Sequence, residues 1–165
     1  MKVTINNKEY SVTISKTKIY NEIIKCGADY QCVVKDANDE KVGAIKFYFD
    51  EMEPIVELKR FKANDFDSAY TLLTALRVFC HNNQSMQIAV SDFSDEINKD
   101  LLINNNEEYN QFEEFLNSLE PQENTFEIDK SDSENFGYSI TLFDETDALS
   151  KVEGYSVQDD TELCK

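Results

Sequence analysis

Residues 57–90 read ELKRFKANDFDSAYTLLTALRVFCHNNQSMQIAV, and this stretch decides the fold. Its middle carries apolar residues at i, i+3, i+4, i+7, i+10 and i+11, namely Ala69, Leu72, Leu73, Leu76, Phe79 and Cys80. That spacing places one apolar stripe along a single face of an α-helix. Asp65 or Asp67 can accept hydrogen bonds from the free amides of the first turn, and Asn82-Asn83 can end the helix. The extended apolar runs on either side predict a strand, a helix and a strand, with the helix lying on a sheet.

An N-terminal hairpin and a short helix are expected near the start of the chain. Polar and apolar residues alternate over residues 2–5 and 10–14, around the turn Asn6-Asn7-Lys8. Because asparagine tolerates a positive φ, this segment predicts a tight hairpin. Residues 17–26 then carry apolar residues at helical spacing, and Gly27 is placed to end a short helix there.

Three extended runs lie between that short helix and the central one. They are YQCVVK at 30–35, KVGAIKFYF at 41–49 and IVELKRF at 55–61. The turns between them are too short for a crossover connection, so consecutive strands must pair as hairpins. The three runs therefore predict an antiparallel meander.

The elements expected after the central helix are a strand over 86–90, a short helix beginning at Ser94, a helix over 107–119, and strands over 125–129 and 137–143. The helix over 107–119 has an apolar stripe and ends before Pro121; the stripe consists of Tyr109, Phe112, Phe115, Leu116 and Leu119. The fold class is therefore α/β (α+β), with a largely antiparallel mixed sheet and helices packed on its faces. We expect one domain over residues 1–143 and a polar, acidic, partly disordered tail over 144–165.

The net charge of −17 is confined to one half of the chain. Residues 1–90 contain as many Lys and Arg as Asp and Glu, so the whole acidic excess lies in residues 91–165. Such an imbalance destabilises the compact state through self-repulsion. It also argues against direct contact of this half with nucleic acid or an anionic membrane, because phosphate contacts need Lys and Arg.

No catalytic motif is present, and we expect no catalytic residue, cofactor or metal. His81 is the only histidine and suits a helix cap or the surface, and neither Cys26 nor Cys32 has an evident base beside it. The four cysteines lack metal-type spacing. Residues 129–134 supply oxygens but lack the glycine and terminal glutamate of an EF-hand loop. The absence of a signal peptide and of a long apolar run makes a cytoplasmic location the expectation.

Acidic residues around the helix over 107–119 form the candidate partner-binding surface. No lysine follows Glu107, Glu108, Glu113 or Glu114 four residues later to offset its charge, so like charges repel along that helix face. One interpretation is a solvated helix that promotes solubility. The other is a carboxylate surface that imitates nucleic-acid phosphates or docks on a basic cleft. The candidate residues are Glu107, Glu108, Glu113, Glu114, Glu120, Glu123, Glu127, Asp129, Asp132 and Glu134.

From Tyr30 onward the order of elements resembles the GNAT acyltransferase fold: a meander, a central helix, a strand, another helix and two strands. In that family a glycine-rich loop of Q/R-x-x-G-x-G/A type cradles the pyrophosphate of coenzyme A at the N-terminus of the central helix. Here residues 60–68 read RFKANDFDS, without glycine, and Asp65 and Asp67 bring negative charge. Only Arg60 and Lys62 have the sign that such a site needs. The resemblance implies the fold and lacks the motif that carries the chemistry.

These observations lead to one main expectation and two alternatives. The main expectation is a non-enzymatic acidic inhibitor, of the immunity-protein or phage anti-defence type, that blocks a basic partner. A nuclease or another nucleic-acid-binding enzyme is the expected partner class, through a nucleic-acid-mimicking surface. The alternatives are a GNAT-like acyltransferase or inactive relative, with coenzyme A near Arg60 and Lys62, and a plain structural or oligomerising subunit.

Overall fold

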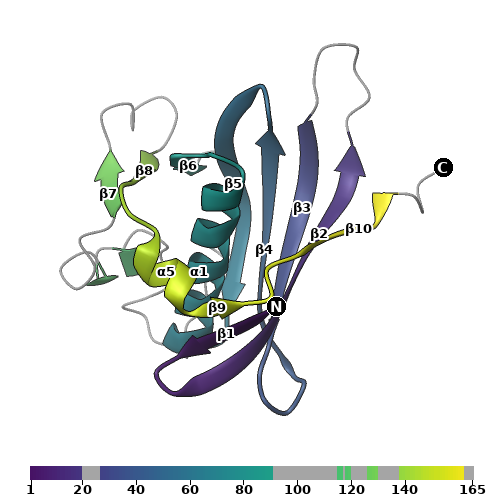
Figure 1. The fold of residues 1–165 in the computed structure, drawn as a ribbon, viewed down its shortest axis with the longest axis vertical. Coiled ribbons are helices and arrows are strands. Elements are labelled where there is room, and N and C mark those ends of the chain that lie inside the picture. Colours follow the sequence, from purple (N-terminus) through teal and green to yellow (C-terminus); the bar gives the residue numbers. More distant parts are fainter. Residues whose placement is uncertain (20–26, 91–114, 117, 120–125, 130–137, 162–165) are drawn as a thin grey trace.

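The computed structural model describes residues 1–19, 27–90, 115–116, 118–119, 126–129 and 138–161. Over these residues the protein is a mixed α/β structure with one large, mostly antiparallel sheet and two helices (Figure 1). The strands are β1 (Lys2–Ile5), β2 (Lys8–Ile19), β3 (Gly27–Lys35), β4 (Lys41–Asp50), β5 (Glu53–Ala63), β6 (Gln87–Val90), β7 (Phe126–Asp129), β8 (Tyr138–Leu142), β9 (Val152–Glu153) and β10 (Val157–Asp159). The helices are α1 (Phe66–Asn82) and α5 (Thr146–Ser150).

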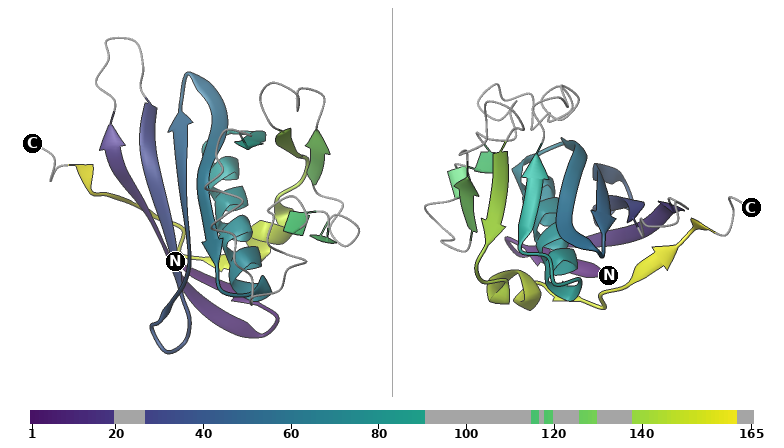
Figure 2. Two further views of the ribbon diagram at one scale, coloured as in Figure 1. Left: turned by 180° about the vertical axis from the view of Figure 1, so that it is seen from behind. Right: turned by 90° about the horizontal axis from the view of Figure 1, so that it is seen from above.

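The strands lie in the order β7-β8-β6-β5-β4-β3-β2-β1-β9, and β10 pairs with residues 14–16 of β2. All neighbours are antiparallel except β5 with β6 and β2 with β10. The crossover from β5 to β6 runs through α1, as a parallel pair requires. Figure 2 shows α1 lying against one side of the strands β3, β4 and β5.

The core lies between α1 and this side of the sheet. Alternate residues of the central strands point toward the helix, and Ile45, Phe47 and Phe61 are almost completely buried there. The ring of Phe79 from α1 packs edge-on against Phe47 and Phe49, with centroids 4.9 and 5.4 Å apart. The stripe predicted from residues 69–80 is thus the buried face of the helix, which confirms the central prediction.

The first turn of α1 is closed by its own side chains. The carboxylate of Asp65 accepts a 2.7 Å hydrogen bond from the Ser68 amide, and the Ser68 hydroxyl accepts one from the Asp65 amide at 3.1 Å. This reciprocal capping box satisfies two amides that the helix itself leaves unpaired. Of the two aspartates considered as caps, Asp65 is the one used.

The N-terminal hairpin and the meander form as predicted. Asn6 and Asn7 have φ values of 49° and 62°, as a tight turn between β1 and β2 requires. The short helix predicted over residues 17–26 is wrong for its first three residues, which extend β2, and Lys18 and Ile19 pair with β3. Its remainder, like the helix expected at Ser94, lies outside the described residues. Of the helix predicted over 107–119, Phe115, Leu116, Ser118 and Leu119 are described, and all four are helical.

Residues 144–161 carry α5, β9 and β10, three short elements that the sequence analysis did not anticipate. They are held by contacts with distant parts of the chain. The Lys151 ammonium donates to the Tyr70 hydroxyl at 2.7 Å, and the Thr4 amide donates to the Lys151 carbonyl at 3.0 Å. The Arg77 guanidinium, almost fully buried, donates to the Asp144 carbonyl at 2.9 Å.

Neither described helix has the length and apolar character needed to cross a membrane.

Candidate functional site

The structure describes two of the ten acidic candidates. Glu127 and Asp129 lie on β7, the strand at one edge of the sheet. The side chain of Glu127 is exposed. The other eight candidates, at positions 107, 108, 113, 114, 120, 123, 132 and 134, lie outside the described residues.

The described part of the acidic half is rich in exposed carboxylates. Its one described cation, Lys151, forms a 2.7 Å ion pair with Asp147. The other exposed carboxylates of residues 138–161 are Asp144, Glu153, Asp159 and Asp160. Hydrogen bonds from the hydroxyl and amide of Thr146 lower the pKa of Asp144. A partner can reach these exposed groups from solvent.

The described cysteines and the histidine do not form a catalytic pair. Cys32 and Cys80 are buried, and burial raises the pKa of each thiol to about 12. Such thiols stay protonated and behave as small apolar groups. His81 lies at the end of α1, half exposed, with its Nδ1 3.9 Å from Glu145 Oε2. Among the described residues, no three His, Cys, Asp or Glu side chains gather as metal ligands.

The N-terminus of α1 is filled by the protein's own groups. The Asp65 carboxylate accepts a hydrogen bond from the Ser68 amide. The Asp67 carboxylate accepts hydrogen bonds from the side chains of Asn6 and Lys8, each at 2.9 Å. Burial raises the pKa of Asp67, but the bonds from Lys8 and Asn6 outweigh it, so the net shift is downward. Two carboxylates and the tip of the β1–β2 hairpin therefore lie where the GNAT resemblance would place a pyrophosphate.

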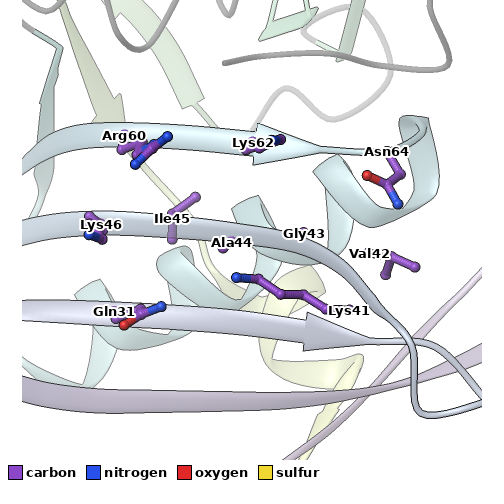
Figure 3. Close-up of a pocket in the computed structure, with 10 residues that line it drawn as sticks. All are labelled: Gln31, Lys41, Val42, Gly43, Ala44, Ile45, Lys46, Arg60, Lys62 and Asn64. Atoms are coloured by element: carbon purple, nitrogen blue, oxygen red, sulfur yellow. The ribbon is translucent and has the colours of Figure 1, made fainter.

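The opposite face of the sheet carries a hollow over β3, β4 and β5, with a volume of about 440 Å³ (Figure 3). We call it the cationic hollow, because its lining includes four cations and no carboxylate. It is lined by Gln31, Lys41, Val42, Gly43, Ala44, Ile45, Lys46, Arg60, Lys62 and Asn64. In a chain with 33 acidic and 16 basic residues, such a lining stands out.

Strand alternation creates this hollow. Ile45 and Phe61 point into the core, so their neighbours Lys46, Arg60 and Lys62 point to the other side and are exposed. A bulge in β5 after Leu58 sets the register in which Lys46 lies opposite Arg60. Figure 3 shows the Lys41 side chain extending alongside β4 toward Ala44.

The sequence analysis named Arg60 and Lys62, but it placed them at the start of α1 rather than on the far face of the sheet. Lys41 and Lys46 were missed. The available signal was the alternation of cations with core residues in KVGAIK and LKRFK. A smaller hollow adjoins this one and is lined in part by Thr17, Asp29 and Lys59. The carboxylate of Asp29 therefore lies on that side of the cationic hollow.

No protein family, no curated protein and no solved structure matches the chain.

Proposed function

We propose that this protein is a non-enzymatic inhibitor of the immunity-protein or anti-defence type, whose acidic half binds a basic partner and blocks it. A nuclease or another nucleic-acid-binding enzyme is the partner class that a carboxylate surface fits. The observation that carries the proposal is the confinement of the −17 charge to residues 91–165, beside a balanced first half. Such a field accelerates encounter with a basic cleft and selects against acidic partners.

The described residues support a binding role in two ways. Exposed carboxylates such as Glu127 and Asp144 remain available to a partner. The described thiols are buried and protonated, so they supply no nucleophile. In this proposal residues 1–143 form one domain, with helices packed on the faces of its sheet, and the protein acts in the cytoplasm.

Capture from a lysate of the cells that make the protein tests the proposal. The wild type is immobilised beside a variant that we call the acidic-helix variant, and bound proteins are eluted along a salt gradient and identified by mass spectrometry. The acidic-helix variant is Glu107→Lys, Glu108→Lys, Glu113→Lys and Glu114→Lys. One basic protein retained by the wild type, lost from the variant and released by moderate salt is expected. Identical retention on both columns, or no retained protein, would contradict the proposal.

A GNAT-like acyltransferase, or an inactive relative, is the second candidate, and the order of elements favours it. The meander β3–β5, the helix α1, the parallel strand β6 and the final strands β7 and β8 follow the order of that family. The carboxylates of Asp65 and Asp67 at the helix N-terminus favour the inactive relative over the enzyme.

Thermal unfolding with acetyl-coenzyme A tests this second candidate. A ligand present at 100 times its Kd stabilises the native state by about 2.7 kcal/mol, which gives a clear rise in the unfolding temperature. An unchanged unfolding temperature at millimolar ligand would exclude a coenzyme A-binding protein. The result is independent of the capture experiment, because the acidic surface and the start of α1 are different parts of the chain.

A further inference from the structure

We propose that the cationic hollow on the open face of β3–β5 binds a small anion that carries two or more phosphate groups. This inference does not rest on the acidic-inhibitor proposal, which concerns the other half of the chain. It rests on the arrangement of charges on three neighbouring strands and on the shape of the hollow between them.

The first step is the pairing of like charges. Lys46 lies directly opposite Arg60 in the β4–β5 ladder, and Gln31 of β3 lies opposite Lys46 on the other side. Like charges at directly opposed positions destabilise a sheet. Lys46 is exposed, so a neutral polar residue could replace it without loss of packing. An anion bound in the hollow would be attracted by Lys46 and by the other cations of its lining.

The second step is the spacing of the cations. Adjacent strands lie about 4.8 Å apart, and Lys62 follows Arg60 by two residues, or roughly 6.7 Å along the strand. A ligand with one negative charge can neutralise only part of this group. A diphosphate or triphosphate presents several charged oxygens over such a distance, and a phosphate group carries nearly two charges and three strong acceptors. The guanidinium of Arg60 can donate two parallel hydrogen bonds to one phosphate.

The third step is the shape of the site. Ala44 lies opposite Lys62 on the floor of the hollow, and its small side chain leaves room between the longer ones. The volume of about 440 Å³ lies within the range of small-molecule sites, about 300–1,000 Å³. The side-chain amides of Gln31 and Asn64 add neutral hydrogen-bond donors at the rim. The size of the hollow therefore suits a small polyphosphate.

Titration calorimetry with inorganic triphosphate, as the sodium salt, tests the proposal on the full-length protein. The experiment is run in about 0.1 M salt, where the Debye length is about 10 Å and distant carboxylates are largely screened. Lys46→Glu reverses one charge in the hollow, and Lys2→Glu makes the same change on β1, where Lys2 is exposed beside Glu9. Ala44→Leu keeps every charge and fills the floor.

Binding by the wild type is expected, with a loss of about tenfold or more in Lys46→Glu, as removal of one charged hydrogen-bonding group predicts. Ala44→Leu should also weaken binding, and Lys2→Glu should leave it unchanged within about twofold, since Lys2 makes no contact in the hollow.

Absence of binding by the wild type would overturn the proposal. So would equal weakening by Lys2→Glu, or full binding by Ala44→Leu, because either points to diffuse attraction. Self-association that triphosphate does not displace and Lys46→Glu abolishes would assign the face to a second copy instead. Circular dichroism of each variant confirms that the sheet is retained.

Discussion

Lys8 and Asp67, 59 residues apart in the chain, form a 2.9 Å ion pair that joins the N-terminal hairpin to the first turn of α1. Asn6 donates to the other oxygen of the same carboxylate at 2.9 Å. The turn that presents both donors needs two consecutive residues with positive φ, which asparagine supplies. The hairpin is thereby fixed across the start of the helix rather than left as a free arm.

The carboxylate of Asp67 makes stability depend on pH. Burial raises its pKa, but the hydrogen bonds from Lys8 and Asn6 lower it by more, so the folded value lies below the ordinary 3.8. Its contribution is therefore present above the unfolded pKa and is lost as the pH falls through the folded value. Asp67→Asn should cost less than about 1 kcal/mol at pH 7, since Lys8 is exposed. In urea unfolding from pH 7 to pH 2, the two proteins should converge in acid, and a constant difference would be inconsistent with the ion pair.

Asp65 is expected to contribute more to the stability of α1 than Asp67 does. Asp65→Ala removes the acceptor of the Ser68 amide and should lower the free energy of unfolding by about 1 kcal/mol, within a range of 0.5–2. Asp65→Asn keeps an acceptor in the same place and should retain most of that stability. Urea denaturation of the three proteins measures both effects. An equal loss in the two variants would show that charge rather than capping is at work.

Much of this fold follows from local patterns. The stripe from Ala69 to Cys80, the asparagine turn and the short connections of the meander each depend on residues close in sequence. The extension of β2 through Ile19 does not, because it depends on pairing with β3. In residues 144–161, Lys151 meets Tyr70 from 81 positions away. A propensity argument cannot anticipate elements that such tertiary contacts stabilise.

The cationic hollow was hidden from the sequence for a similar reason. Gln31, Lys46 and Arg60 become neighbours only when three strands pair in one register. The bulge in β5 decides that Lys46 meets Arg60 rather than Lys59, and no pattern in the sequence indicates where a bulge falls. The acidic surface, by contrast, was visible as composition alone, and its arrangement in space stays a prediction.

Reversal of one charge should make the sheet more stable. Lys46→Glu replaces a repulsive cross-strand pair with an attractive one, which is worth about 0.2–1 kcal/mol between opposed residues. Urea unfolding at low salt measures the gain, and the gain should fade near 1 M salt, where the Debye length is about 3 Å. A destabilised variant would contradict the cross-strand placement of Lys46 and Arg60.

The two buried thiols should resist modification in the native state. With pKa values raised to about 12, Cys32 and Cys80 have almost no thiolate at pH 8. In a background carrying Cys26→Ser and Cys164→Ser, iodoacetamide should label neither thiol until denaturant unfolds the protein. Mass spectrometry of the intact chain counts the labels. Labelling at the rate of a free thiol in native buffer would show that the core opens at this position.

Association kinetics give the most direct test of the acidic half as the binding surface. The partner obtained by capture is mixed with the wild type, with the acidic-helix variant and with a control that has the same charge change in the first half of the chain. That control is Glu40→Lys, Glu51→Lys, Glu53→Lys and Glu57→Lys, at four exposed positions.

The wild type and the control should associate fast at low salt, with rates that fall steeply as salt is added. The acidic-helix variant should associate at least about tenfold more slowly at low salt and show a weaker dependence on salt. Equal rates for the two variants would contradict the account, because the charge of the whole chain, and not its acidic half, would then govern the encounter.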